Sequence, residues 1–227
     1  CFFYMMNGMR QFVCVSVAFG SVDLIKNKKT WKILLLTAVL VFVHSTVVIL
    51  VLIYFIANMK PWGKNVFLFM AVIILICVFV EPFFGGLDQV VQGTSYENDI
   101  STYFAIDDGV NPLRVILYAV PPICSFLLRN EMKEYYEKYP ILSICVNMSL
   151  LTAAIYLVGM FTSGIFIGRL PIYSELYDLI LIPFLFRIGF KKEDRRFIVL
   201  SVIAVLLLYF YLTGPSVYHC DWFGTFY

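Results

Sequence analysis

Residues Gly8–Ala57, on which the architecture of the chain depends, read GMRQFVCVSVAFGSVDLI, then KNKKTWK, then ILLLTAVLVFVHSTVVILVLIYFIA. An apolar segment that begins with Arg10 is followed by a lysine-rich loop and by a long apolar run, which is interrupted only at His44-Ser45-Thr46. An ionisable side chain at membrane depth is costly unless it faces a cavity or a partner. Arg10 and His44 are therefore candidates for one functional site.

The composition sets the class of protein. Of the 227 residues, 61% are hydrophobic and 14% are charged, whereas soluble domains carry about 25% charged residues. In lipid every backbone polar group must be bonded internally, which favours helices. We therefore predict an all-α, polytopic integral membrane helical bundle. The net charge of +2, without a soluble basic face, argues against a nucleic-acid partner.

About seven apolar segments follow one another along the chain. They lie at roughly 8–25, 33–57, 66–84, 113–128, 141–166, 176–190 and 197–214. A crossing helix needs about 17–25 apolar residues, and snorkelling ends help the shorter ones. These segments predict a single membrane domain over residues 1–227.

The loops set the predicted topology, because cytoplasmic loops collect Lys and Arg. The lysine-rich loops 26–32 and 58–65 are both expected inside, so the run 33–57 has to enter and return as a re-entrant pair of half-helices. Its tip is expected at His44-Ser45-Thr46. Otherwise the loop 58–65 is an exception to the rule, or another span fails to cross. The loop 85–112 has five acids and no Lys or Arg, which predicts an external acidic loop, and the C-terminus is also expected outside.

This topology brings three arginines and a histidine to the outer side of the membrane, where basic residues are otherwise depleted. They are Arg10, His44, Arg114 and Arg169. A guanidinium group matches phosphate oxygens, so the cluster predicts capture of a lipid-linked phosphate or pyrophosphate. Each residue also has a structural interpretation: Arg10 and Arg114 snorkel to headgroups, Arg169 pairs with Glu175, and His44 packs against a neighbouring helix.

The acidic outer loop combines aromatic rings with carboxylates, as sugar sites do. We predict a substrate-binding set that also takes in two residues of the later segment GRLPIYSE: Tyr96, Asp99, Tyr103, Asp107, Asp108, Tyr173 and Glu175. The alternative is a solvated loop with an interfacial segment. The chain has no HExxH motif, no P-loop and no acidic pair with clear metal spacing, so neither a metal nor a cofactor is expected.

Three segments in order carry a family resemblance. The first is MRQ at Met9–Gln11, with the lysine-rich loop and the run ending in His-Ser after it; the second is NPLR at Asn111–Arg114, and the third is GRLPIYSELYDLILIP at Gly168–Pro183. Together they resemble the EpsG family of Wzy-like bacterial polysaccharide polymerases, over most of residues 4–190.

The resemblance implies a glycosyltransferase-type enzyme. Such polymerases join oligosaccharide repeat units carried on polyprenyl (undecaprenyl) pyrophosphate at the outer face of the bacterial inner membrane, and they make exopolysaccharide, capsule or O-antigen. The implied partners besides the lipid bilayer are a flippase and a chain-length regulator of the same pathway. The implied catalytic residues are Arg10, His44, Arg114 and Arg169. His44 is the first choice of general base, with Asp107 or Asp108 behind it.

The chain departs from the family at its start, because family members carry several spans before the MRQ helix. We therefore expect it to be the C-terminal portion of a longer polymerase. Two other functions fit the same residues. A transporter or flippase of lipid-linked sugars would bind through the arginines without chemistry, although the internal repeats common in transporters are not visible. A non-catalytic subunit of an envelope polysaccharide assembly complex would tolerate loss of all four basic residues.

Overall fold

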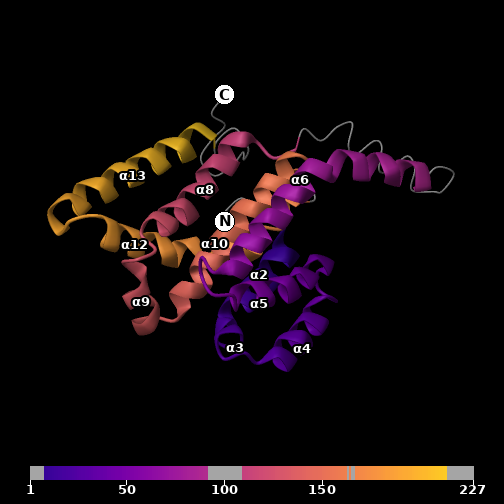
Figure 1. Ribbon diagram of the computed structural model, residues 1–227, viewed down its shortest axis with the longest axis horizontal. Coiled ribbons are helices and arrows are strands. Elements are labelled where there is room, and N and C mark those ends of the chain that lie inside the picture. Colours follow the sequence, from indigo (N-terminus) through magenta and orange to yellow (C-terminus); the bar gives the residue numbers. More distant parts are fainter. Residues whose placement is uncertain (1–7, 92–108, 163, 165–166, 214–227) are drawn as a thin grey trace, which may run out of the picture. The chain divides into compact units, whose positions relative to one another are not determined.

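The computed structural model describes residues 8–91, 109–162, 164 and 167–213, and the regular elements in these ranges are all helical (Figure 1). The chain divides into two compact units at residues 185 and 186. The elements of the first unit are α2 (Met9–Gly20), α3 (Val22–Lys26), α4 (Thr30–Leu40), η1 (Ser45–Val48), α5 (Ile49–Ala57), α6 (Lys64–Val91), α8 (Pro112–Leu127), α9 (Met132–Lys138), α10 (Ile141–Met160), η2 (Ile167–Arg169) and α11 (Ile172–Glu175). Helix α12 (Asp178–Gly189) crosses the division, and α13 (Lys192–Thr213) belongs to the second unit.

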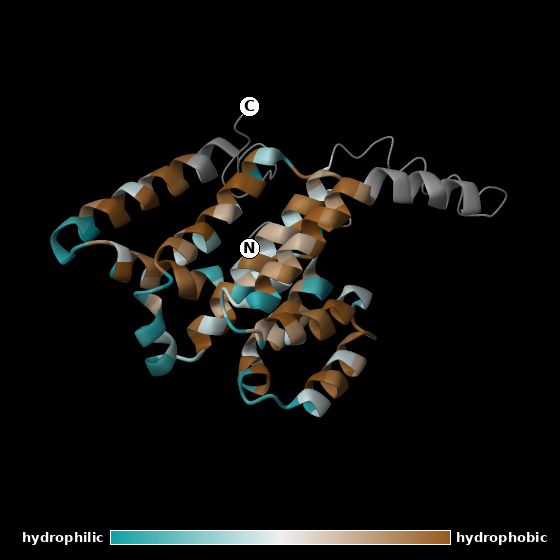
Figure 2. Cartoon of the chain, viewed as in Figure 1, coloured by the Kyte–Doolittle hydropathy of each residue, from teal (hydrophilic) through white to brown (hydrophobic). Residues whose placement is uncertain are grey.

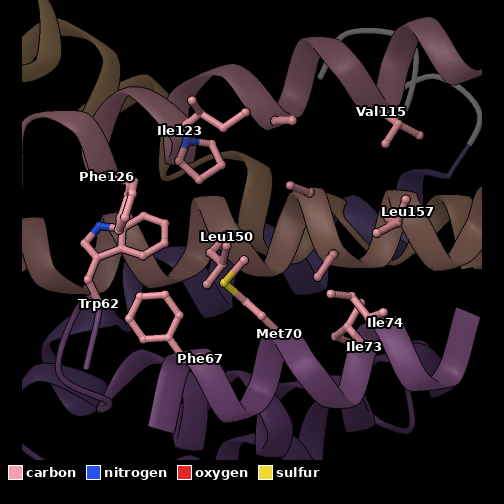
Figure 3. A pocket seen from close by; sticks show the side chains of 14 residues that line it. Trp62, Phe67, Met70, Ile73, Ile74, Val115, Ile123, Phe126, Leu150 and Leu157 are labelled. Carbon is pink, nitrogen blue, oxygen red and sulfur yellow. The ribbon is translucent and has the colours of Figure 1, made fainter. Parts of the chain in front are cut away.

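Helix α10 is the core of the first unit. Fourteen of its twenty residues are buried, and they lie on every side of the helix, as expected for a helix that is apolar all round. It packs against α5, α6, α8 and α11. Figure 3 shows α10 running between α8 and α6, with a cavity lined by apolar side chains from all three helices.

The end of α10 lies earlier than the sequence predicted. The expected apolar segment 141–166 stops being helical at Met160, and in its last turn the carbonyl of Gly159 accepts from the backbone N–H of Val110 at 3.0 Å. Two glycines permit this close approach. A Cβ on Gly159 or Gly168 would lie 2.8 or 2.9 Å from a Val110 methyl group.

The run 33–57 is broken where the sequence predicted. Helix α4 ends at Leu40, a turn leads to His44, and the chain continues through η1 into α5. The hydroxyls of Thr30 and Tyr54 share a hydrogen bond, so the start of α4 lies beside the last turn of α5. The break and the return are confirmed, and the insertion of this hairpin into a membrane stays a prediction.

A buried amide ties the hairpin to the core helix. The side chain of Asn147 on α10 donates to the carbonyls of Ile56, Ala57 and Met59 at 3.1, 3.4 and 2.7 Å. The last carbonyls of a helix have no partner within the helix, and Asn147 supplies one at the end of α5. The open end of the hairpin, away from the turn at His44, is thereby held against the most deeply buried helix.

Length and composition support fewer crossings than the sequence predicted. Among the described residues, α10 is long and apolar enough to span a membrane, and α8 with α9, which are bent by 95° at the break, make a second span if counted as one. Helices α2, α4 and η1–α5 are apolar but shorter. The prediction of about seven crossing segments is therefore not confirmed, although polar residues do gather between α3 and α4 and on α9 (Figure 2).

The predicted external acidic loop at 85–112 overlaps the end of a helix, while its position relative to a membrane stays a prediction. Helix α6 continues to Val91 and α8 begins at Pro112. Gly85 and Gly86 each disfavour a helix by about 1 kcal/mol relative to alanine, which does not end a helix of 28 residues. The predicted sugar-binding residues of this loop, Tyr96, Asp99, Tyr103, Asp107 and Asp108, lie outside the described residues.

The hairpin makes a prediction about sidedness. In a cysteine-free background, single cysteines at Lys29 and Lys60 should react with a membrane-impermeant maleimide from the same side, because α4 and α5 return to one end. Reaction of Arg169→Cys from the opposite side would complete the predicted topology. Labelling of positions 29 and 60 from opposite sides would show that the run crosses the membrane once.

Candidate functional site

The site begins on α2, where the MRQ motif sets two adjacent side chains in different environments. The buried residues Gln11, Cys14, Val15 and Ala18 recur at the spacing of one helix face. Arg10 lies next to this face, since successive residues turn by about 100°, and it is exposed. The helix thus buries an amide and presents a guanidinium group beside it.

The Gln11 amide joins three segments that are far apart in the sequence. Its Nε2 donates to the hydroxyl of Thr46 at 3.4 Å and to the backbone carbonyl of Arg169 at 3.2 Å. Gln11 is 4% exposed, and a buried amide without partners costs roughly 1–3 kcal/mol. Its two hydrogen bonds therefore fix η1 and η2 against α2.

His44 stands at the break of the hairpin and caps η1. Its backbone is extended, and its Nδ1 accepts from the Thr46 backbone N–H at 3.4 Å and lies 2.7 Å from the Thr46 hydroxyl. A backbone N–H only donates, so Nδ1 acts as the acceptor. In the neutral ring the proton is thereby assigned to Nε2. His44 presents an N–H donor.

Arg10 and Arg169 complete what we call the basic cluster (Arg10, His44 and Arg169). Both arginines are exposed, and both lie close enough to His44 to act on it electrostatically. Like charges at short range repel, and an anion between them relieves that repulsion. The basic cluster thus gathers exposed cationic side chains around His44, an arrangement whose charge is complementary to an anion.

A second group of side chains surrounds Glu175 and is called here the carboxylate cluster. Glu175 is 4% exposed, and its Oε2 accepts from the hydroxyls of Tyr118 and Tyr156, each at 3.0 Å. The guanidinium carbon of Arg114 lies 5.8 Å from the centre of the Tyr156 ring. The structure therefore places Arg114 with Glu175.

Helix α11 connects the two clusters. The Tyr173 hydroxyl lies 3.1 Å from the Thr46 hydroxyl, beside the basic cluster, whereas Glu175 belongs to the carboxylate cluster. The Ser174 hydroxyl between them is bonded to Thr152 of α10 at 2.7 Å. Pro171 is the N-cap of this short helix, and its carbonyl accepts the N–H groups of Ser174 and Glu175, which is why the GRLPIYSE segment turns here.

The NPLR motif has an equally local explanation. The Asn111 side chain accepts from the backbone N–H of Leu113 at 2.8 Å and caps α8. Pro112 follows at the start of the helix, where its missing N–H costs nothing. Arg114 is thereby fixed in the first turn.

The structure brings together only part of the site that the sequence predicts. Three of the four predicted basic residues come together, with Tyr173 beside them, while Arg114 and Glu175 lie in the other cluster. The prediction missed four residues that make the contacts: Gln11, Thr46, Tyr118 and Tyr156. Gln11 and Thr46 had a signal, because polar side chains inside apolar runs need partners, but the two tyrosines resemble ordinary packing residues. Within the described ranges no three His, Cys, Asp or Glu side chains converge as metal ligands.

The Gln11 amide can be tested by a change that keeps its approximate size. Gln11→Leu leaves the Arg169 carbonyl and the Thr46 hydroxyl without their donor, which should cost about 1–2 kcal/mol and lower the midpoint of thermal unfolding in detergent by about 2–8 °C. Ser16→Ala is the control, because the exposed Ser16 hydroxyl bonds only to its own helix. Equal unfolding midpoints for the two variants would contradict the bridging role.

Comparison with known proteins gives one positive result. The model of the EpsG family matches residues 1–224. No curated protein and no solved structure matches the chain.

Proposed function

The chain belongs to the EpsG family, which gives it a general role in exopolysaccharide biosynthesis, and from this premise we propose that it polymerises oligosaccharide repeat units carried on polyprenyl pyrophosphate. The observation that carries the proposal is the basic cluster, held together by the buried Gln11 amide. A cluster of donors beside apolar helices suits a lipid whose head is a diphosphate.

The proposed reaction is a glycosyl transfer between two lipid-linked sugars. A hydroxyl oxygen of the incoming unit forms a bond to the anomeric carbon of the growing chain. The bond from that carbon to the diphosphate oxygen breaks, and the polyprenyl diphosphate leaves with the bonding electrons. The proton of the attacking hydroxyl passes to a base. Negative charge therefore grows on the diphosphate as the reaction proceeds.

Arg10 and Arg169 are proposed to stabilise that charge. Preorganised donors aimed at developing charge are usually the largest catalytic term, and removal of one costs roughly 10²–10³ in rate. Both guanidinium groups are exposed beside His44, so a diphosphate can reach them without a rearrangement of the core.

His44 is proposed as a further donor to the diphosphate. Its Nδ1 is occupied by Thr46, which leaves Nε2–H as the group available to an anion. This geometry favours a donor over the general base that the sequence suggested first. Asp107 and Asp108, the second choices for the base, stay predictions outside the described residues.

Tyr173 and Glu175 are proposed to position the site. Both side chains are almost fully buried, at 3% and 4% exposure, and their polar atoms are bonded within the protein. Sugar contact needs accessible groups, so the geometry favours a role in holding α11. Arg114, which is exposed near the surface of the carboxylate cluster, is the member proposed to meet the second lipid-linked substrate.

The proposed setting is the outer face of a bacterial inner membrane. The lipid bilayer, a flippase that delivers the repeat units and a chain-length regulator are the proposed partners. The competing functions differ in where lipid-linked single repeats collect: a flippase defect leaves them on the cytoplasmic side, and a polymerase defect leaves them outside.

The arginines supply the main test. In the full-length protein in its native host, Arg10→Ala and Arg169→Ala should each lower polymer formation about 100-fold and leave lipid-linked single repeats on the outer side, with unchanged protein levels. Arg129→Ala is the matched control, because this exposed arginine lies over the Phe126 ring. Normal polymer length in both site variants would end the catalytic proposal.

Substitutions of His44 distinguish a role as hydrogen-bond donor to the diphosphate from a role as general base. His44→Gln keeps an amide N–H at a similar reach and should retain at least about a tenth of polymer formation, whereas His44→Ala should lose about 100-fold. The readout is the ratio of polymer to single repeats on a gel. Equal, complete loss in both variants would assign His44 to proton removal.

A further inference from the structure

A groove on the surface of α5 begins at the candidate site. Ser45, Thr46 and Leu170 line one end, and Val48, Leu52 and Phe55 are among the residues that continue it, with a volume of about 600 Å³. The last three follow a helical spacing of four and three residues, which puts them on one face. They are 62%, 48% and 60% exposed, so this face is open along its length.

The groove has the dimensions of part of a lipid chain. Ten residues separate Ser45 from Phe55, which corresponds to about 15 Å along a helix, or about half of a hydrocarbon core of roughly 30 Å. Its walls are carbon except for the hydroxyls of Ser45 and Thr46 at one end. A long apolar chain fits such a surface, and a sugar or a peptide backbone would lose its hydrogen bonds there.

The polar end of the groove coincides with the basic cluster. Thr46 lines the groove and is bonded to His44 and Tyr173, and Leu170 directly follows Arg169. A molecule that occupies both places has an anionic head at the guanidinium groups and an apolar tail on α5. Charge complementarity at one end and hydrocarbon at the other select an amphiphile.

We propose that the α5 groove binds the isoprenoid chain of the lipid diphosphate, with the units nearest the diphosphate beside Thr46 and Leu170. The inference rests on the proposed function for the identity of the head group. It adds the path of the chain, which runs along the exposed face of α5, the second half of the hairpin, from Thr46 toward Phe55. The break at His44 therefore serves both parts of the substrate: it presents the imidazole and starts the groove.

A second apolar cavity serves as a control site for the binding of an isoprenoid chain. It has a volume of about 420 Å³ and lies between α6, α8 and α10, with Trp62 and Phe126 at one end and Val115 and Leu157 at the other (Figure 3). It is as apolar as the groove, but its lining does not include the residues that adjoin the basic cluster. A tail that simply seeks hydrocarbon would enter this cavity as readily.

Photo-crosslinking distinguishes the two places. The full-length protein in nanodiscs carries p-benzoylphenylalanine at Phe55, in the groove, or at Phe67, in the cavity, two phenylalanines of similar exposure at 60% and 48%. The probe is radiolabelled geranylgeranyl diphosphate. Position 55 should be labelled at least about 5-fold more than position 67, and unlabelled geranylgeranyl diphosphate should abolish the labelling, while geranylgeraniol and phosphatidylglycerol should not.

Other labelling patterns overturn the proposal. Equal labelling at positions 55 and 67, or stronger labelling at 67, places the tail elsewhere. If geranylgeraniol or phosphatidylglycerol competes as strongly as unlabelled geranylgeranyl diphosphate, the diphosphate head contributes nothing and the surface has no specific occupant.

A filling substitution gives an independent measure. Leu52→Trp should lower two quantities, each about 10-fold. One is the labelling of p-benzoylphenylalanine at Phe55 by the probe, and the other is polymer formation. Val39→Trp, at a similarly exposed position of α4, should leave both unchanged. Unchanged labelling and unchanged polymer formation with Leu52→Trp would overturn the proposal that the groove binds the isoprenoid chain.

The proposed binding of the isoprenoid chain in the groove and the proposed polymerase function would fail with different experimental results. If Arg10→Ala and Arg169→Ala stop polymerisation while position 55 is not labelled, the groove is wrong and the function stands. If position 55 is labelled specifically while the arginine variants still polymerise, the lipid site stands and the catalytic proposal fails.

Discussion

The arrangement of the site depends on one buried amide. Gln11 lies on the apolar face of α2, where its side chain has lost contact with water, and it meets its need for acceptors with the Thr46 hydroxyl and the Arg169 carbonyl. Those acceptors belong to segments 35 and 158 residues away. Because an unpaired buried amide is expensive, the three segments must meet, and their meeting brings Arg10, His44 and Arg169 together.

The core helix α10 supports this arrangement from behind. Its side chains make polar contacts at intervals along its length: Asn147 with the end of α5, Thr152 with Ser174, and Tyr156 with Glu175. Each is a buried hydrogen bond in apolar surroundings, where imperfect partners are costly. The helix therefore fixes the hairpin and α11 in register as well as burying their apolar faces.

Part of this structure follows from the sequence. The break at His44 was predicted because two lysine-rich loops cannot lie on one side of a membrane unless the run between them returns. The segments NPLR and GRLPIYSE were recognised through the family resemblance and supplied candidate site residues. The end of α10 at Met160 and the length of α6 were not predicted, since hydropathy records neither the contact of Val110 with Gly159 nor the tolerance of a long helix for Gly85 and Gly86.

The division of the site into two clusters was also not predictable from the sequence. Arg114 and Arg169 look alike in the sequence, and only the packing of Tyr118 and Tyr156 around Glu175 separates them. Short apolar helices such as α2 and α12, with twelve residues each, also replace the longer spans that hydropathy suggested. Hydropathy records where apolar residues lie, whereas caps, prolines and tertiary contacts decide where a helix ends.

The brevity of α11 has a consequence for how the two clusters communicate. Four residues are too few to bend within themselves, so a displacement of Tyr173 is transmitted to Glu175, two residues on. If the proposed anion draws the hydroxyl network around Thr46 toward itself, the displacement would change the energy of the Tyr118–Glu175–Tyr156 triad. Thermodynamic linkage would make such an effect mutual: under the proposed function, occupancy of either cluster would alter the affinity of the other by the same factor.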